Sequence, residues 1–138
     1  MSGKLLAIDF GTKRTGFAIT DDLQIIATAL TTIPTHKVFE YIKDLLLKEK
    51  ISSFIVGFPK DLKGRNTNST AHVSSFIKKL QKQYNNIPIF KIDERFTSKI
   101  AKQTILSSGV KKNIRKKKEL VDKISATIIL QSYLDLRR

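Results

Sequence analysis

Residues 5–16 restrict the fold of this chain more than any other segment. Four apolar residues, Leu5 to Ile8, run directly into the carboxylate of Asp9. Such a run is typical of a buried strand, and an acid at its end is costly to bury unless a positive group meets it there. The turn that follows contains two glycines and two basic residues, Gly11, Lys13, Arg14 and Gly16. An acid at a strand end with basic residues close by suits a metal ion and a phosphate group.

The order of the apolar segments predicts an α/β fold. We expect strands at residues 5–9, 17–20, 25–31, 54–57 and 87–92. Helices are expected at residues 34–50, 73–84, 97–109 and 115–136. An antiparallel meander followed by β/α alternation favours a mixed five-stranded sheet flanked by helices, with its first, fourth and fifth strands parallel. No repeat or linker interrupts the chain, so residues 1–138 are expected to form a single domain.

Two connections have characteristic residues. Asp21 and Asp22 are expected to form the turn between the second and third strands, because aspartate tolerates turn conformations. Pro34 is expected in the first turn of the first helix, where proline is favoured.

The charge of the chain points to a polyanionic partner. There are 26 Lys and Arg residues against 12 Asp and Glu residues, which gives a formal net charge of +14 at pH 7. This excess predicts binding to nucleic acid with an affinity that falls as salt is added. A general solubilising charge bias is the alternative. The absence of cysteine excludes disulfides and thiolate metal sites.

No apolar run approaches the ~20 residues of a membrane-spanning helix. The first residues lack the pattern of a signal peptide. A cytoplasmic location is therefore expected.

Three acids are predicted to converge at one edge of the sheet. Ligands of open α/β sheets bind at the carboxyl ends of strands, where Asp9 and the pair Asp93 and Glu94 are expected. Asp122 lies on the packing face of the last helix, in line with Ala126. Adjacent strand residues face opposite ways, so Asp93 and Glu94 compete for the site, and Glu94 is favoured for its longer reach.

Three carboxylates make an oxygen-rich site of the kind that Mg²⁺ and Mn²⁺ prefer. Two such ions ~3.5–4 Å apart can activate a water molecule and stabilise the leaving oxygen of a phosphodiester. Each acid also has a simpler interpretation. Asp9 could cap a turn or pair with Lys13, Glu94 could pair with Arg95 at the surface, and Asp122 could form a salt bridge with a lysine.

Basic residues are expected around these acids. Six of the eight residues from 111 to 118 are basic, and this run directly precedes Asp122. It is either a solvated segment or the rim of a phosphate-binding site. The loop at residues 57–68, in which backbone amides and a basic residue precede a helix, is either an anion site or an ordinary connecting loop. The candidate substrate-binding residues are Lys13, Arg14, Arg65, Arg95, Lys116, Lys117 and Lys118.

Four motifs, in order and covering essentially the whole chain, match those of a known family. They are Asp9-Phe-Gly11-Thr-Lys13-Arg14-Thr-Gly16, Val56-Gly57-Phe-Pro59 with Gly64, Asp93-Glu94-Arg95-Phe-Thr97, and Asp122-x-x-x-Ala126-x-x-Ile129-Leu130-Gln131-x-Tyr133-Leu134. The chain thereby resembles the YqgF (RuvX) family, of RNase H-like fold. Its members are described as Holliday junction resolvases and as nucleases of precursor small-subunit ribosomal RNA. The departures are mild and remove no acid: Ala7, Phe96, Ser98 and Ser125.

The resemblance implies that Asp9, Glu94 and Asp122 are the catalytic acids and that Mg²⁺ or Mn²⁺ is the cofactor. The leading hypothesis is a metal-dependent nuclease that matures pre-16S ribosomal RNA, acting on structured RNA or on ribosomal precursor particles, as a monomer or a homodimer. The alternatives are a resolvase of four-way DNA junctions and a non-catalytic RNA-binding module. A nucleotide-binding protein similar to actin-like ATPases is a further alternative, although those proteins close two such domains around ATP.

Overall fold

The computed structural model describes residues 3–58, 68–93 and 114–137, with side chains described for residues 3–58, 70–93 and 125–137. The elements follow the expected order. They are β1 (Lys4–Phe10), β2 (Arg14–Thr20), β3 (Ala27–Pro34), the short 3₁₀ helix η1 (Thr35–Lys37), α1 (Val38–Lys48), β4 (Ile51–Phe58), α2 (Asn68–Gln83), β5 (Ile89–Asp93) and α4 (Ile114–Arg137). The helix expected at residues 97–109 lies outside the described residues.

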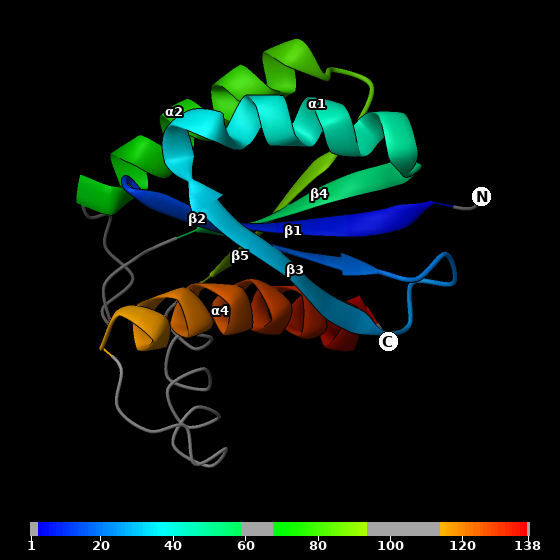
Figure 1. Ribbon diagram of the computed structural model, residues 1–138. Coiled ribbons are helices and arrows are strands. Elements are labelled where there is room, and N and C mark those ends of the chain that lie inside the picture. The colour runs from blue at the N-terminus through cyan, green and yellow to red at the C-terminus, as the bar shows by residue number, and fades with distance from the viewer. Residues whose placement is uncertain (1–2, 59–67, 94–113, 138) are drawn as a thin grey trace.

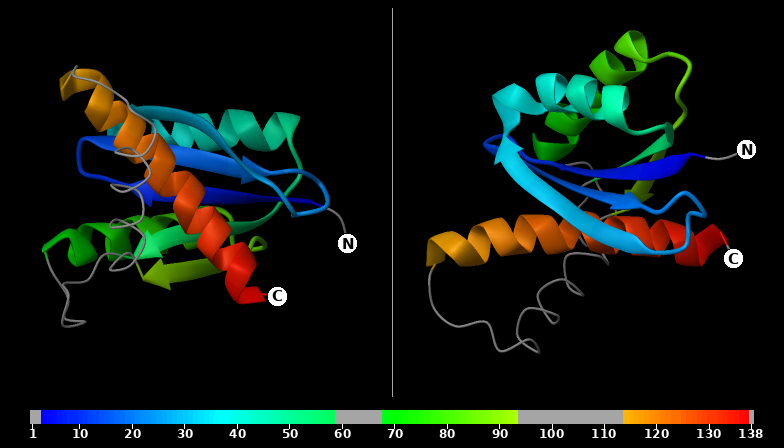
Figure 2. Two further views of the ribbon diagram at one scale, coloured as in Figure 1. Left: turned by 90° about the horizontal axis from the view of Figure 1, so that it is seen from below. Right: turned by 45° about the vertical axis from the view of Figure 1, so that its right-hand side comes forward.

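The five strands form one sheet in the order β3-β2-β1-β4-β5. β2 pairs antiparallel with both β1 and β3, whereas β4 pairs parallel with both β1 and β5. The predicted meander and the predicted parallel arrangement of β1, β4 and β5 are therefore confirmed. Helices cover both faces of this sheet: α1 and α2 lie on one face and α4 crosses the other (Figures 1 and 2).

Side-chain alternation in β1 explains its uninterrupted apolar run. Leu6 and Ile8 pack in the cluster beneath α1 and α2, whereas Leu5 and Ala7 pack in the cluster beneath α4. All four are at most 1% exposed. A strand covered by helices on both faces needs apolar residues at every covered position, so β1 is apolar from Leu5 to Ile8 and its acid follows only at Asp9.

Small residues allow α4 to lie close to the sheet. Ala7 of β1 pairs directly with Ala18 of β2, and both pack in the same cluster as Ala126 of α4. None of the three is exposed to solvent. This confirms that the helix face containing Ala126 is a packing face, and that the last helix contacts the sheet through a small residue.

Two boundaries differ from the sequence-based expectation. Pro34 ends β3 with extended backbone (φ −58°, ψ 137°), so its placement in the first turn of a helix is wrong; the η1 turn separates it from α1. β3 begins at Ala27, later than expected, because the carboxylate of Asp21 accepts hydrogen bonds from the backbone N–H groups of Ile25 (2.8 Å) and Ile26 (3.0 Å).

The pairing of β1 with β4 contains a bulge. Lys4 pairs with Ile51 and Leu5 with Ser53, which leaves Ser52 as an extra residue. Gln24, in left-handed backbone conformation (φ 57°), reaches this point from the connection between β2 and β3. Its side-chain amide donates to the carbonyl of Gly3 (2.7 Å) and to the hydroxyl of Ser52 (3.1 Å). The bulge is thus held by a residue distant in sequence.

Replacing Ala126 with leucine is expected to lower the free energy of unfolding by about 1–3 kcal/mol, because a fully buried contact leaves no room for added carbons. Urea unfolding followed by circular dichroism measures this change. The control is Asp135→Leu on the exposed side of the same helix, which is expected to stay within about 0.5 kcal/mol of the original chain. Equal stability of the two variants would contradict the close packing of α4.

The hydrogen bonds to Asp21 predict a pH dependence. The N–H groups of Ile26 and Ile25 lower the pKa of Asp21 below its ordinary value of 3.8. A carboxyl group with a lowered folded-state pKa stabilises the fold above its unfolded pKa, and this contribution is lost as pH falls through the folded value. Asp21→Ala should therefore lower the urea midpoint at pH 6, and the difference from the original chain should shrink below about pH 3.8. A difference that does not change with pH would contradict this prediction.

Candidate functional site

Asp9 lies on the α4 face of the sheet. Its neighbours Ile8 and Phe10 both face α1 and α2: Ile8 is part of that cluster, and the ring of Phe10 stacks on Phe76 of α2 at 4.4 Å between centroids. Because side chains alternate along a strand, the half-buried Asp9 between them faces α4. Its cross-strand partner in β2 is Gly16, which has no side chain. The only side chain of this antiparallel pair is therefore a carboxylate.

Three parallel strands end at the same edge as Asp9. In the parallel registers, Ile8 of β1 pairs with Val56 of β4, and Phe58 at the end of β4 pairs with Asp93 at the end of β5. This is the edge at which open α/β sheets bind ligands. The predicted placement of Asp9 and Asp93 at strand ends is confirmed.

The packing of Ile92 indicates the face of the sheet on which Asp93 lies. Ile92 packs in the α4 cluster, and therefore Asp93, the next residue, lies on the face of α1 and α2. The structure thus places Asp93 on the opposite face from Asp9. Glu94 lies outside the described residues.

The backbone position of Asp122 lies in α4, one helical turn before Ala126. Both Figure 1 and Figure 2 show the N-terminal end of α4 at the end of the sheet where β1 finishes. The part of α4 that precedes the buried Ala126 therefore runs toward the edge that holds Asp9. Among the residues whose side chains are described, no group of three or more His, Asp or Glu side chains is arranged to hold a metal ion.

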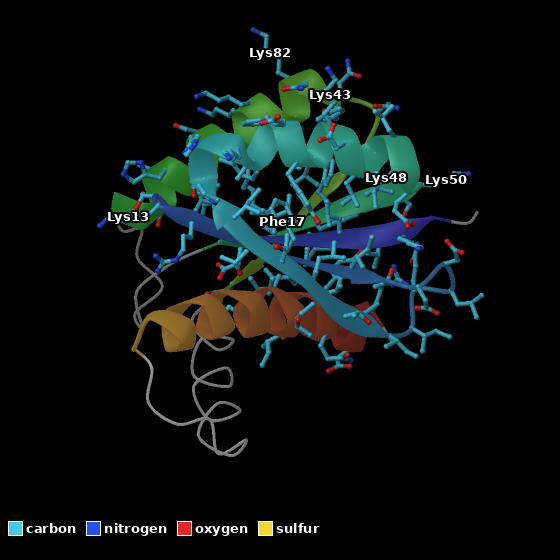
Figure 3. All side chains as sticks on the ribbon, viewed as in Figure 1. Lys13, Phe17, Lys43, Lys48, Lys50 and Lys82 are labelled. Carbon is cyan, nitrogen blue, oxygen red and sulfur yellow. The ribbon has the colours of Figure 1, made fainter. Side chains whose placement is uncertain are left out.

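The predicted substrate-binding residues fall into three sets. Lys13 is exposed in the turn after β1, and Arg14 is the half-buried first residue of β2. Figure 3 shows Lys13 at the same end of the sheet as the N-terminal end of α4. Residues 116–118 belong to the first turns of α4, with their side chains outside the description. Arg65 and Arg95 lie outside the described residues.

The turn that follows Asp9 is restricted to glycine at its first position. A Cβ atom added to Gly11 would stand 2.4 Å from the backbone carbonyl oxygen of Arg14, a distance at which the two atoms overlap. The close approach of these two backbone segments explains why a glycine follows Phe10. It also brings Arg14 back beside the end of β1.

Sequence reasoning missed the residue that anchors this turn. The hydroxyl of Thr35 donates to the carbonyl of Gly11 (2.6 Å), and the backbone N–H of Thr35 donates to the carbonyl of Lys13 (3.0 Å). Because Thr35 donates its hydroxyl proton to Gly11, the buried Thr15 hydroxyl donates to the hydroxyl oxygen of Thr35, at 2.9 Å. No local pattern signals this role, since Thr35 is 24 residues from Gly11.

Solved structures share this architecture. Thermus thermophilus RuvC in complex with a Holliday junction substrate is similar with a TM-score of 0.57 at 13% sequence identity, and the match covers 97% of this chain and 96% of that chain. A second structure of RuvC from this organism is similar with a TM-score of 0.55 at 11% identity over the same shares. At such identities the likeness shows the fold alone. It shows that the chain has an RNase H-like α/β fold.

The family described as RuvX, Holliday junction resolvase, matches residues 3–136. The chain belongs to this family. A relative from Flavobacterium johnsoniae, named "Putative pre-16S rRNA nuclease", is 45% identical over 135 residues, which are 98% of each chain. A relative of the same name from Phocaeicola vulgatus is 47% identical over 135 residues, 98% of this chain and 97% of the relative. Both the family and its relatives are thus described as enzymes that hydrolyse phosphodiester bonds.

None of the described helices combines the length and the apolar composition that a membrane span requires.

Thr35→Val is expected to lower the free energy of unfolding by about 1–3 kcal/mol, because it leaves the buried Thr15 hydroxyl and the Gly11 carbonyl without their partner. The matched control is Thr28→Val at an exposed position of β3, where valine suits the strand and the change should be near zero. Urea unfolding of the two variants measures the difference. Equal stabilities would show that the Thr35 hydroxyl does not anchor the turn.

Proposed function

We propose that residues 1–138 act as a single metal-dependent nuclease domain that hydrolyses phosphodiester bonds in the precursor of 16S ribosomal RNA. The observation that carries the proposal is the position of Asp9. Its carboxylate is at the ligand-binding edge of the sheet, faces α4, and lies opposite the bare backbone of Gly16. Relatives that match almost the whole chain have names that describe this substrate.

The acids proposed to act with Asp9 are Glu94 and Asp122. Asp93 is on the opposite face of the sheet from Asp9, which supports Glu94 as the member of the pair that serves the site. Asp122 precedes the buried Ala126 by one turn, on the helix that covers the Asp9 face. Residues one turn apart share a helix face, and this supports the assignment of Asp122 to the same pocket.

The described part of the site suits a hard divalent cation. A half-buried carboxylate at a strand end offers oxygen ligands, and the chain contains no cysteine that would favour a softer metal. We assign Mg²⁺ or Mn²⁺ to Asp9, Glu94 and Asp122. When bound, the metal would supply Lewis-acid activation of water and neutralisation of the scissile phosphate.

The basic residues have a separate task in this proposal. Carboxylates repel the phosphates that flank the scissile bond, so binding of the RNA backbone needs cations nearby. Asp9 is followed by Lys13, in the turn that Thr35 anchors, and by Arg14 at the start of β2. This anchoring would limit the entropy lost when the turn binds phosphate. Arg65, Arg95 and the lysines at 116–118 are proposed to extend this contact. The net charge of +14 supports a polyanionic substrate.

A second candidate is cleavage of four-way DNA junctions. The matching family is described as a Holliday junction resolvase, and the similar RuvC structure was solved with a junction substrate. A symmetric junction requires two cuts, so this activity predicts a homodimer with twofold symmetry. RNA cleavage has no such requirement. A non-catalytic RNA-binding module is the third candidate, and it predicts that Asp9 can be replaced without loss of cellular role.

Asp9→Asn is expected to lower metal-dependent cleavage of precursor 16S ribosomal RNA by at least about 100-fold. Loss of an outer-shell partner alone costs 10–100-fold in metal affinity or activity, and this change removes the charge of a proposed ligand itself. Cleavage is measured with Mg²⁺, Mn²⁺ or EDTA, and a four-way DNA junction is tested in parallel. The matched control is Asp44→Asn at an exposed position of α1, which should retain full activity.

Full activity of Asp9→Asn, or cleavage that persists in EDTA, would overturn the proposed mechanism. Preference for the DNA junction, together with a dimeric solution mass, would favour the second candidate. Equal circular dichroism spectra for Asp9→Asn and Asp44→Asn would establish that a loss of activity does not come from unfolding.

A further inference from the structure

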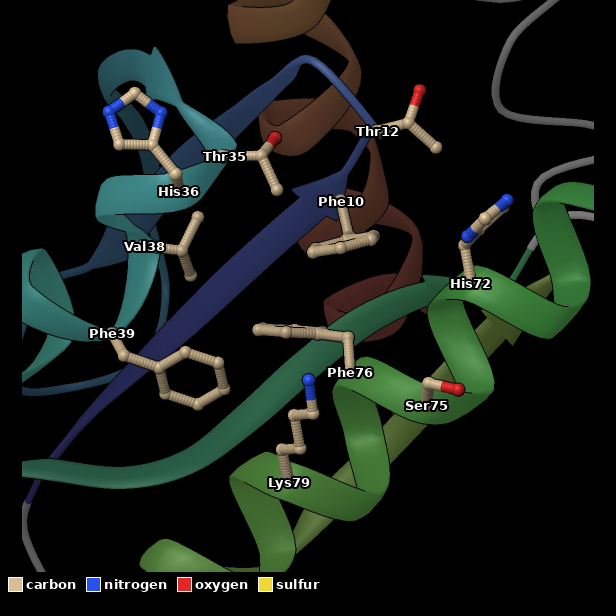
Figure 4. Close-up of a pocket in the computed structure, with 10 residues that line it drawn as sticks. All are labelled: Phe10, Thr12, Thr35, His36, Val38, Phe39, His72, Ser75, Phe76 and Lys79. Carbon is tan, nitrogen blue, oxygen red and sulfur yellow. The ribbon is translucent and has the colours of Figure 1, made fainter.

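A cavity of about 480 Å³ lies on the other side of the strand end that holds Asp9. It opens between η1 and α2 above the end of β1, on the face covered by α1 and α2 (Figure 4). Its volume falls within the range of small-molecule pockets. Sequence reasoning gave no indication of it, because its walls come from three separate parts of the chain, residues 10–12, 35–39 and 72–79. The lining residues are Phe10, Thr12, Thr35, His36, Val38, Phe39, His72, Ser75, Phe76 and Lys79.

The floor of the cavity is aromatic. Phe10 stacks on Phe76 at 4.4 Å, and Phe39 contacts Phe76 at 5.5 Å with an interplanar angle of 52°. Phe76 is 3% exposed, whereas Phe10 and Phe39 remain half-buried and retain surface toward the cavity. Ring faces in such a position are the usual platforms on which nucleobases stack.

The rim of the cavity is polar and basic. The two histidines of the chain, His36 and His72, line it from η1 and α2, on two sides of Phe10 (Figure 4). Lys79 of α2 and the hydroxyls of Thr12 and Ser75 complete the rim, and no acidic side chain is among the lining residues that the structure describes. An aromatic floor under a rim of this kind suits a ligand that is flat and anionic at once, and a nucleotide has both properties.

The position of the cavity connects it to Asp9. Asp9 and Phe10 are consecutive residues, so their Cα atoms are about 3.8 Å apart, yet they face opposite sides of the sheet. Thr12, which lines the cavity, and Lys13 both belong to the turn that links β1 to β2. A flexible nucleic-acid chain that passes around this turn can therefore reach both faces, whereas a stiff duplex cannot bend so sharply.

We propose that this cavity binds an unpaired nucleotide of the RNA substrate, with its base on the Phe39 ring and its phosphate beside Lys79. The inference rests on the proposed nuclease function and specifies its substrate: RNA with a single-stranded segment next to the cleaved bond. Uniform duplex RNA is excluded from the cavity, because its bases are not available for stacking on a side chain.

The histidines provide a direct measurement. Since the chain has two histidines and both line the cavity, its two imidazole C2–H proton signals in NMR report on occupancy. A single-stranded RNA hexamer of uridines is titrated into the protein in EDTA, so that no cleavage occurs. Both signals are expected to shift along one saturable curve. Duplex RNA and inorganic phosphate are expected to shift them far less at the same concentration.

Matched pairs of variants test the two parts of the site. Phe39→Leu should weaken hexamer binding about tenfold, since stacking of one base on an aromatic ring is lost. The control is Phe90→Leu on β5, because the Phe90 ring contacts Tyr133 on the α4 face. This control variant should bind the hexamer as the original chain does. Lys79→Ala should make the slope of log K against log salt concentration shallower by about 0.7, as expected for the loss of one phosphate contact of a single strand. Its neighbour Lys78, which does not line the cavity, should have a smaller effect when replaced with alanine.

Three results would overturn the inference: no shift of either histidine signal, equal shifts with duplex RNA or inorganic phosphate, or equal binding by Phe39→Leu and Phe90→Leu. The test is independent of Asp9 and metal. If the histidine signals do not shift but cleavage depends on Asp9, only the proposed nucleotide pocket is contradicted. If the signals shift as expected but Asp9→Asn keeps full activity, the proposed catalytic site is contradicted and the nucleotide pocket is supported.

Discussion

The close contact between α4 and the sheet is the constraint on which the rest of the arrangement depends. Ala7, Ala18 and Ala126 are fully buried in the same cluster between α4 and the sheet, and larger side chains at these positions would push the helix outward. Because an α-helix is rigid over one turn, this contact also determines how near the preceding turn, which contains Asp122, comes to the end of β1. A contact made of methyl groups, with no chemistry of its own, therefore sets the geometry of the proposed acidic pocket.

Much of the fold was predictable because β1 is covered on both faces. A continuous apolar run that ends in Asp9 has few interpretations, and the order of strands and helices followed from similar runs and spacings. Pro34 was misplaced because proline suits both a helix start and the end of an edge strand, and the tertiary pairing of Arg14 with Pro34 decided the outcome. Thr35 and the aromatic cavity were not predictable, since each depends on contacts between residues far apart in the chain.

The candidate site was predictable to a different degree at each acid. The expected position of Asp9 at the carboxyl end of the first strand is confirmed. The choice between Asp93 and Glu94 required the packing of Ile92, which identifies the face on which Asp93 lies. The assignment of Glu94 and Asp122 stays a prediction. One strand end thus serves two surfaces, with a carboxylate on the α4 face and aromatic rings on the other.

The bulge at Ser52 has an evolutionary consequence. Because Asp9 and Phe10 point in opposite directions, a shift of β1 by a single position would bury the acid among phenylalanine rings and expose a ring to the substrate edge. The extra residue at Ser52, which Gln24 holds by a hydrogen bond, sets the register in which β1 pairs with β4 from Leu5 onward. This register determines the face of the sheet on which Asp9 lies. An insertion or deletion within residues 5–9 would therefore reverse the faces on which Asp9 and Phe10 lie, so changes in chain length are restricted to the connections outside the sheet.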